Sequence, residues 1–283
     1  MKNIIIIGAG PAGVSASLYT VRAGFETTVI AKKGGGLYKA EKIENYYGFR
    51  DAISGRELYE NGIEGAKRLG VKFVESEVVG MGFSDKFTVK TEENEYSADA
   101  VIIATGSKRT KPNINVDEFE GKGVSYCAVC DAFFYRGKVV AVLGNSNYAL
   151  HEASELWNVA NSVTLLTNGE DTEIENEHLK INKKKIKELQ GNGVLEKVVF
   201  QDGSDLKICG LFIALGTAGS TDLARKMGIE TNGNNIVTIE NGATNIPGIF
   251  AAGDCTGGLL QISKAVYDGA KAGISAVNFL RGK

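Results

Sequence analysis

The chain has 283 residues, more than the roughly 150 of a typical domain, so its length predicts two domains. Apolar residues make up 43% and charged residues 23%, as in globular proteins, which excludes a disordered or fibrous chain. A formal net charge of -2 gives no basic field for nucleic acid or an anionic membrane surface, and no apolar run approaches the ~18 residues of a membrane span.

The N-terminal residues predict a dinucleotide site. Residues 3–7 form a β-branched apolar run typical of a central parallel strand, and residues 8–13 read Gly-Ala-Gly-Pro-Ala-Gly. In this pattern the glycines permit a tight turn, a close backbone approach to a pyrophosphate, and close packing of the helix that follows. That helix is expected to end at Gly24, before a second strand at 27–31. The residues expected to hold the nucleotide are Gly8, Gly10, Pro11, Ala12 and Gly13.

The connection after the second strand departs from the usual pattern. Lys32 follows the strand where many dinucleotide sites have an acid that holds a ribose hydroxyl, so the ribose must be held otherwise. A long stretch rich in glycine and aromatic residues comes next, and such loops inside compact domains are usually functional. Ser54, with Glu57 three residues later, then predicts a capping box for a helix that ends near Leu69.

Short strands complete the first part of the first domain. Alternating segments near 71–75, 86–91 and 94–98 predict a small β-meander. Residues 100–106 predict a buried strand that ends in Ala-Thr-Gly, after which a polar connector leaves the domain.

Residues 126–131 read Tyr-Cys-Ala-Val-Cys-Asp. The thiols of Cys127 and Cys130 can close a small disulfide ring or bind a metal, and Asp131 favours the disulfide because a carboxylate can carry the protons that its reduction requires. The other two cysteines and the two histidines lack zinc-site spacing, so no metal is expected. The chain enters its first strand without a signal-peptide pattern, which predicts the cytoplasm, where structural disulfides are rare and such a pair is catalytic or metal-binding.

The second domain repeats the order of elements that is expected at the start of the first. A strand at 138–143, the turn Gly-Asn-Ser-Asn-Tyr-Ala at 144–149, a helix toward Trp157 and a strand at 163–167 repeat the β-α-β order. Ser146 stands where a second glycine would admit a pyrophosphate, so this fingerprint is damaged. A lysine-rich helix with a solvated face is expected over residues 176–190, and short strands follow.

The C-terminal part returns to the first domain. Residues 248–254 read Gly-Ile-Phe-Ala-Ala-Gly-Asp, a buried strand and a Gly-Asp turn, and residues 261–280 predict a long Ala-rich helix. The predicted fold class is α/β, with two Rossmann-like three-layer domains. The first is discontinuous, with residues 1–107 and 217–283, and the smaller inserted domain, residues 108–216, carries the cysteine pair.

These motifs together resemble the low-molecular-weight thioredoxin reductases of the FAD-dependent pyridine nucleotide-disulfide oxidoreductases. The resemblance covers essentially the whole chain in order and rests on residues 8–13, 44–46, 104–106, 126–131 and 248–254. It implies a homodimeric enzyme that binds FAD in its first domain and reduces the disulfide of thioredoxin. In such an enzyme Cys130 would face the flavin, Cys127 would attack the partner's disulfide, and Asp131 would move protons. The further residues that the resemblance places at the FAD site are Asn45, Ala104, Thr105, Gly106, Gly253, Asp254, Gln261 and Ile262.

The second domain departs from that family in its NADPH motifs. The family has an intact glycine fingerprint and a His-Arg-Arg stretch, whereas this chain has Ser146 in the turn and Leu-Thr-Asn-Gly at 166–169. Each lost charge-assisted hydrogen bond to a 2′-phosphate costs roughly 1.5–3 kcal/mol. The chain is more similar to the ferredoxin-dependent flavin thioredoxin reductases, which implies reduced ferredoxin as the electron donor.

Other interpretations stay open at this point. The donor could be NAD(P)H, or a second flavin could fill the vacated nucleotide site. A ferredoxin-NADP reductase would need a nicotinamide site and no Cys-x-x-Cys pair, and a flavin redox sensor would need an output module. Cys209 and Cys255 are expected to be small buried apolar residues, with a redox role open for Cys255. His151 and His178 are expected on helices outside any catalytic group.

Overall fold

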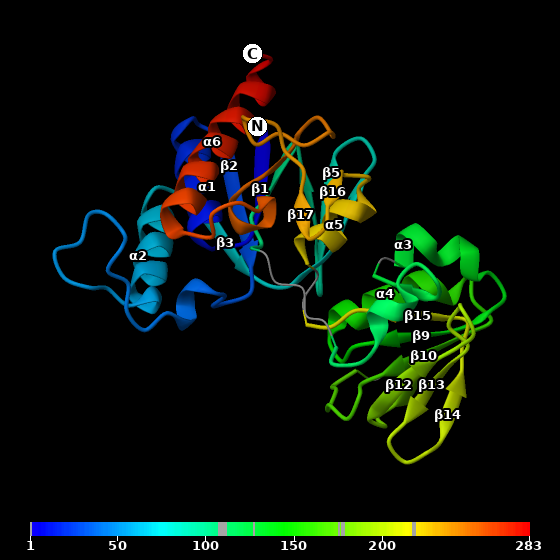
Figure 1. Cartoon of the computed structure of the whole chain (residues 1–283). Helices are drawn as coiled ribbons and strands as arrows, with labels where there is room; N and C mark the ends of the chain where they lie inside the picture. Colours follow the sequence, from blue (N-terminus) through cyan, green and yellow to red (C-terminus); the bar gives the residue numbers. More distant parts are fainter. Residues whose placement is uncertain (1, 107–111, 127, 175, 177–178, 217–218) are drawn as a thin grey trace. The chain divides into compact units, whose positions relative to one another are not determined.

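The structure, a computed structural model, describes residues 2–106, 112–126, 128–174, 176, 179–216 and 219–283. The chain divides into two compact units, which are Met1–Lys108 with Gly219–Lys283 (unit 1) and Arg109–Ala218 (unit 2) (Figure 1). Each unit contains a five-stranded parallel sheet, so the predicted α/β class with Rossmann-like sheets is confirmed. Over the described residues, no helix has both the length and the apolar character needed to cross a membrane.

The central sheet of unit 1 has the strand order β18-β7-β1-β2-β3. Its strands are β1 Asn3–Ile7, β2 Glu26–Ala31, β3 Lys72–Glu75, β7 Ala100–Ile103 and β18 Ile249–Ala251. The isoleucines of β1 are at most 2% exposed, as expected for a strand that is paired on both sides and covered on both faces. Because all five strands are parallel, their carboxyl ends share one edge, where the loops that follow them meet.

The α-helices that the structure describes in unit 1 are α1 Pro11–Arg22, α2 Gly55–Arg68, α5 Ser220–Lys226 and α6 Ile262–Arg281. Helices α1 and α6 lie side by side (Figure 1). Their backbones approach so closely that a Cβ added at Gly269 would lie 2.0 Å from the carbonyl oxygen of Ala12. The predicted start of α2 is confirmed, since Ser54 is its N-cap and the Ser54 Oγ accepts a hydrogen bond from the Glu57 amide.

A small antiparallel sheet in unit 1 corrects one prediction. Its strands are β4 Val78–Phe83, β5 Phe87–Thr91 and β6 Glu95–Ala98. The segment near 71–75 is not part of this meander, because β3 pairs in parallel with β2 at the edge of the central sheet. Alternation shows that a segment is a strand but not which edge it joins. Minor elements of unit 1 are η1 Leu37–Lys39, β16 Thr231–Asn232, β17 Asn235–Ile236 and η4 Gly253–Thr256.

Unit 2 is built on a parallel sheet of order β11-β10-β9-β15-β8 and an antiparallel meander of order β12-β13-β14. The parallel strands are β8 Val124–Ser125, β9 Val139–Leu143, β10 Ser162–Leu166, β11 Lys180–Asn182 and β15 Gly210–Ile213. The meander strands are β12 Ile186–Gln190, β13 Lys197–Phe200 and β14 Asp205–Lys207. The helical segments are η2 Val116–Phe119, α3 Ala128–Asp131, η3 Ala132–Tyr135 and α4 Asn147–Trp157.

The prediction of a lysine-rich helix over residues 176–190 is wrong, since this stretch contains β11 and β12. A β-bulge between Ile186 and Glu188 explains the error. By adding one residue to the strand, the bulge lets Ile186 and Leu189 both be buried, and that spacing imitates a helical period. The lysines themselves are exposed, as expected of a solvated face.

Candidate functional site

The glycine turn after β1 forms a cradle at the carboxyl edge of the sheet in unit 1. Gly8 has φ 110°, and a Cβ there would lie 2.3 Å from the carbonyl oxygen of Ala104. A Cβ at Gly13 would lie 1.8 Å from the Gly8 oxygen, so both positions require glycine. In contrast, a Cβ at Gly10 would meet no atom within 4 Å. The open side of Gly10 is therefore where a ligand can approach the backbone.

The start of α1 suits an anionic group. Gly10 is the N-cap, no side chain caps the helix, and its first turn carries no acidic residue. Pro11 occupies the first helical position, where a missing N–H costs nothing. The amides of Ala12 and Gly13 precede the first intrahelical donor, the amide of Val14, which donates to the Gly10 oxygen at 3.0 Å. These residues fit the pyrophosphate of a dinucleotide.

The end of β7 adjoins this cradle. The Ala104 amide donates to the carbonyl oxygen of Ile7 at 2.8 Å, which places the Ala-Thr-Gly segment beside the glycine turn. Gly106 has φ 79°, a conformation that favours glycine. Thr105 Oγ1 is buried and has no hydrogen-bond partner among the described residues. A buried hydroxyl without a partner is costly, so a bound polar ligand would stabilise this position.

The Gly-Asp turn after β18 reaches the same cradle. The Ala252 amide donates to the Ile103 oxygen at 3.0 Å, and Gly253 follows with φ 83°. A Cβ at Gly253 would lie 2.8 Å from the Cβ of Ala12, so the turn packs against the first turn of α1. The structure thus brings Asp254 to the sheet edge that carries the glycine turn. This is the arrangement that the resemblance implied, although the role of Asp254 itself stays a prediction.

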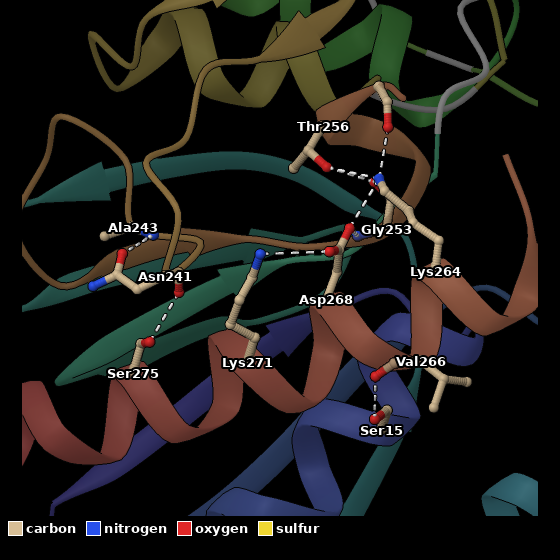
Figure 2. A network of polar contacts seen from close by, with 11 residues as sticks. Ser15, Asn241, Ala243, Gly253, Thr256, Lys264, Val266, Asp268, Lys271 and Ser275 are labelled. Carbon is tan, nitrogen blue, oxygen red and sulfur yellow. Dashed lines mark hydrogen bonds and ion pairs between the residues drawn. The ribbon is translucent and has the colours of Figure 1, made fainter. Parts of the chain in front are cut away.

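A partly buried lysine, Lys264, holds the Gly-Asp turn in place (Figure 2). Lys264 Nζ donates to the carbonyl oxygens of Gly253 (2.8 Å) and Gly257 (2.6 Å), to Thr256 Oγ1 (3.0 Å), and pairs with Asp268 (2.9 Å). Asp268 also accepts a hydrogen bond from the Gly253 amide at 3.3 Å. The sequence reasoning missed this pair. Its one signal is a lysine and an aspartate four residues apart inside an Ala-rich helix.

Asn45 and Gln261, both expected near the flavin, contact each other. The Asn45 side-chain amide donates to Gln261 Oε1 at 3.0 Å, although the two residues are 216 positions apart. Gln261 is the N-cap of α6, and Ile262 is its first residue. The hydrogen bond therefore ties the aromatic loop before α2 to the start of the helix that supplies Lys264.

A carboxylate does lie near the end of β2, although the sequence pointed to none. Lys32 forms an ion pair with Glu77, whose side chain is only 2% exposed. Burial raises the pKa of the Glu77 carboxyl, and Lys32 partly opposes that effect. Glu77 lies two residues past β3, a strand that the sequence had assigned to another sheet, so its place beside β2 was hidden.

The two remaining cysteines differ in exposure. Cys255 is fully buried, its Sγ lies 3.2 Å from the carbonyl oxygen of Ala252, and burial raises the pKa of its thiol to about 12. The expectation of a buried Cys255 is confirmed, and the raised pKa argues against a redox role because the thiolate is the reactive form. The expectation that Cys209 is buried is wrong, since its side chain is exposed. Cys209 lies in the short connection between β14 and β15, and its neighbours Ile208 and Gly210 are buried.

We expect thiol labelling to separate these two cysteines. In a variant with Cys127→Ser and Cys130→Ser, Ellman's reagent at pH 8 should modify Cys209 within minutes and Cys255 only after unfolding. The reason is that Cys255 is buried and stays protonated at that pH. Adding Cys209→Ser should remove the fast reaction, and a fast reaction that survives would contradict the assignment.

Part of the Cys-x-x-Cys stretch lies outside the described residues. Cys127 is one of these, and the side chain of Cys130 is also outside the described part, although Cys130 belongs to α3. Asp131 is described, and its Oδ2 accepts a hydrogen bond from Ser125 Oγ at 2.6 Å. Burial and then the charge of Asp131 raise the pKa of the Tyr135 phenol. Asp131 is thus fixed in orientation next to the cysteine pair in the chain.

Two exposed aromatic residues follow Asp131 after one intervening alanine. Phe133 is 71% exposed and Phe134 is 67% exposed, and their rings contact each other in an edge-on arrangement. Adjacent exposed phenylalanines are unusual on a monomer surface and indicate a protein contact. The predicted site residues do not include them, and their signal in the sequence is a pair of aromatic residues two positions after Asp131.

Residues of the turn after β9 form hydrogen bonds with other loops of unit 2. Ser146 Oγ donates to the carbonyl oxygen of Gly216 at 2.8 Å, and the Asn145 side chain donates to the Asp171 oxygen at 3.1 Å. Thr172 Oγ1 in turn donates to the Asn145 oxygen at 3.0 Å. These bonds join the carboxyl ends of three neighbouring strands of unit 2. A dinucleotide at this edge would have to displace them.

The remaining predicted residues of unit 2 are its two histidines. His151 lies on α4, as expected, with Nε2 3.8 Å from Glu155. His178 lies outside the described residues. Among the described residues, no three His, Cys, Asp or Glu side chains come together as a metal site would require.

Comparisons with known proteins place this arrangement in a family. Residues 2–269 match the pyridine nucleotide-disulphide oxidoreductase family. The thioredoxin reductase of Aquifex aeolicus is 36% identical over 99% of this chain and 94% of its own length, and that of Listeria monocytogenes is 35% identical over 98% and 93%. An atypical thioredoxin reductase, TRi, from Desulfovibrio vulgaris Hildenborough matches with TM-score 0.95 and 41% identity over 100% of this chain and 99% of that chain. A ferredoxin-flavin thioredoxin reductase from Clostridium acetobutylicum matches with TM-score 0.74 and 32% identity, over 99% and 98%.

The chain belongs to the pyridine nucleotide-disulphide oxidoreductase family, which confirms the resemblance inferred from its motifs. Proteins of this family and its thioredoxin reductases are FAD-binding flavoproteins. The chain is accordingly an oxidoreductase with FAD as its cofactor. The open face of Gly10, the uncapped start of α1 and the unpartnered Thr105 hydroxyl all fit that cofactor.

Proposed function

We propose that this chain is a thioredoxin reductase that uses Cys127 and Cys130 as a redox disulfide and takes its electrons from reduced ferredoxin. The balanced reaction consumes two reduced ferredoxins, two protons and one thioredoxin disulfide, and yields two oxidised ferredoxins and one thioredoxin dithiol. FAD supplies the step between one-electron and two-electron chemistry when it is bound to unit 1. The rest of the proposal concerns the residues of the chain itself.

The residues around the cysteine pair support disulfide exchange with a protein. The freed thiolate of Cys127 attacks one sulfur of the thioredoxin disulfide, and Cys130 then resolves the mixed disulfide. Asp131, oriented by Ser125, supplies and removes the protons that these steps require. Phe133 and Phe134 offer exposed aromatic surface close to the pair in the chain, which suits contact with a protein substrate.

One observation carries the choice of electron donor, namely that the second glycine turn is filled by internal hydrogen bonds. Ser146 and Asn145 bridge to residues 216 and 171, where a nicotinamide dinucleotide would place its pyrophosphate. On the neighbouring strand end, Asn168 has φ 53° and accepts a hydrogen bond from the Ile186 amide at 2.7 Å. The Asn168 side chain thus stabilises the protein's own backbone. These contacts support a donor that needs no dinucleotide pocket in unit 2.

Anaerobic titration tests the donor. Reduced ferredoxin should bleach the flavin absorbance of the holoenzyme and support thioredoxin reduction, whereas NADPH and NADH at micromolar concentration should do neither. A chain with NADPH-dependent thioredoxin reductase activity serves as the positive control for the nucleotide. Rapid bleaching by NADPH, with none by reduced ferredoxin, would overturn the proposed donor and leave the disulfide chemistry standing.

Two further parts of the proposal have simple tests. A second flavin in the vacated site would give two flavins per chain after release from the holoenzyme, whereas the proposal expects one. The homodimer rests on the resemblance, and sedimentation should give the mass of two chains. A cytoplasmic location belongs to the same proposal, because a reductase of this kind needs the reduced partners of that compartment.

A further inference from the structure

The nucleotide cradle of unit 1 has no acid at the end of β2. In many dinucleotide sites, a carboxylate about 20 residues after the glycine turn accepts a hydrogen bond from a ribose hydroxyl of the adenosine half. Here β2 ends at Ala31 and Lys32 follows, and neither side chain can accept a hydrogen bond. FAD has such an adenosine half, so an acceptor for its ribose must come from another element.

The last residue of β3 lies beside the position where the acid is missing. Strands β2 and β3 pair in parallel, and Glu75 is the register partner of Ala31. The Ser76 amide donates to the Ala31 oxygen at 3.2 Å, which holds the two strand ends together. The Gly8 amide donates to the Ile30 oxygen at 2.9 Å, so the same end of β2 is joined to the glycine turn. Register partners project from the same face of a sheet, and neighbouring strands are about 4.8 Å apart. The Glu75 side chain therefore starts one strand spacing from the vacant position.

The face that carries Ala31 and Glu75 is the one that α1 and α2 cover. Ala31 packs against the buried cluster that contains Val14 of α1 and Tyr59 of α2. Burial raises the pKa of the Tyr59 phenol, and the charge of Glu75 adds to that effect, so the carboxylate lies near this hydroxyl. Glu75 is thus on the side of the sheet where the start of α1 can receive a pyrophosphate.

Two carboxylates follow each other at the end of β3, and they differ in their availability. Glu77 is ion-paired with Lys32 and is 2% exposed, so a ligand would first have to displace the lysine. Glu75 is exposed, and within the part of the chain that the structure describes its side chain forms no hydrogen bond or ion pair. Glu75 is therefore the acceptor that these strand ends offer to a ribose.

We propose that Glu75, at the end of β3, accepts a hydrogen bond from an adenosine ribose hydroxyl of FAD, in place of the missing acid at the end of β2. Glu75 then contributes to the selection of FAD over FMN, which lacks the adenosine half. The inference takes the pyrophosphate of FAD to lie at the glycine turn, and it does not depend on the identity of the electron donor. A charge-assisted hydrogen bond of this kind is expected to contribute about tenfold in affinity.

FAD analogues that lack the 2′- or the 3′-hydroxyl of the adenosine ribose test this inference. Flavin fluorescence measures the affinity of the full-length apoprotein for FAD, for each analogue and for FMN. The wild type should bind at least one analogue about tenfold more weakly than FAD. Glu75→Ala should bind FAD about tenfold more weakly than the wild type does, and it should bind FAD and that analogue equally. The two losses do not add, because each removes the same hydrogen bond. The affinity for FMN should be unchanged.

Glu26→Ala is the matched control, because Glu26 is an exposed glutamate at the opposite end of β2. It should keep the wild-type affinity for every flavin, and thermal unfolding should show that both variants remain folded. If Glu75→Ala still binds the analogue more weakly than FAD, the inference is overturned. If Lys32→Gln abolishes the difference instead, the ribose is held by the Lys32–Glu77 pair and the inference is also wrong. Equal affinity of the wild type for FAD and both analogues would overturn it without any variant.

Discussion

Cys127→Ser is expected to abolish thioredoxin reduction, by about 10³-fold or more, while the protein keeps its FAD. The physical reason is that a serine hydroxyl remains protonated and cannot form a disulfide, so no mixed disulfide with the substrate can arise. The residues that we propose for the FAD site belong to unit 1, whereas residue 127 falls in unit 2. The measurement is thioredoxin-linked thiol release under anaerobic conditions, with flavin absorbance recorded on the same sample.

Cys130→Ser distinguishes the roles of the two cysteines. This variant should still attack thioredoxin through Cys127 but cannot resolve the product, so a covalent complex should accumulate and dissolve on reduction. Cys127→Ser should form no such complex. Cys209→Ser is the control for an exposed thiol, and it should behave as the wild type. Complex formation by Cys127→Ser alone would reverse the assignment, and turnover by that variant would exclude it.

Gly10→Ala is expected to weaken FAD binding by about 10- to 100-fold with little effect on the fold of the apoprotein. Gly10 has φ -71° and ψ -177°, which an alanine adopts without strain, and the added Cβ would meet no protein atom within 4 Å. The methyl group instead fills the space where the pyrophosphate approaches, and overpacking of this size costs ~1–3 kcal/mol. Flavin fluorescence during titration of the apoprotein measures the affinity.

Two other glycines supply the controls for that result. Gly13→Ala places a Cβ 1.8 Å from the Gly8 oxygen, so it should lower the unfolding temperature of the apoprotein as well as FAD affinity. Gly65→Ala, in the middle of α2 with no atom within 4 Å, should keep FAD affinity and add up to ~1 kcal/mol of stability. Equal FAD affinity of Gly10→Ala and the wild type would show that the pyrophosphate lies elsewhere.

The sequence predicted those parts of the site that are local in the chain. The apolar run, the glycine turn and Pro11 specify β1, its cradle and the start of α1 within about ten residues, and the structure has each of them. The Gly-Asp turn was predictable for the same reason. Its approach to the cradle also followed, because parallel strands end at one edge of the sheet.

Long-range side-chain contacts were not predictable in this way. The sequence does not show that Glu152 reaches the Ala128 amide or that Asn45 meets Gln261, because these contacts depend on packing between separate elements. The pattern of buried and exposed residues also gave a wrong prediction where the backbone geometry of a strand changed the period of that pattern. The bulge at Ile186 made a strand look helical. Cys209, a residue type that is usually buried, is exposed in the short connection between β14 and β15.

The discontinuity of unit 1 has a consequence for biosynthesis. Its sheet lacks an edge strand until β18 has been made, and α1 lacks its close packing partner until Gly269 has left the ribosome. Every strand of unit 2, in contrast, comes from one continuous segment, Arg109–Ala218. Domains generally fold as they emerge, so the cysteine-bearing unit can form while its flavin-binding counterpart is still incomplete. The nascent thiols then meet the redox buffer of the cell before FAD has a complete site from which a disulfide between them could be reduced.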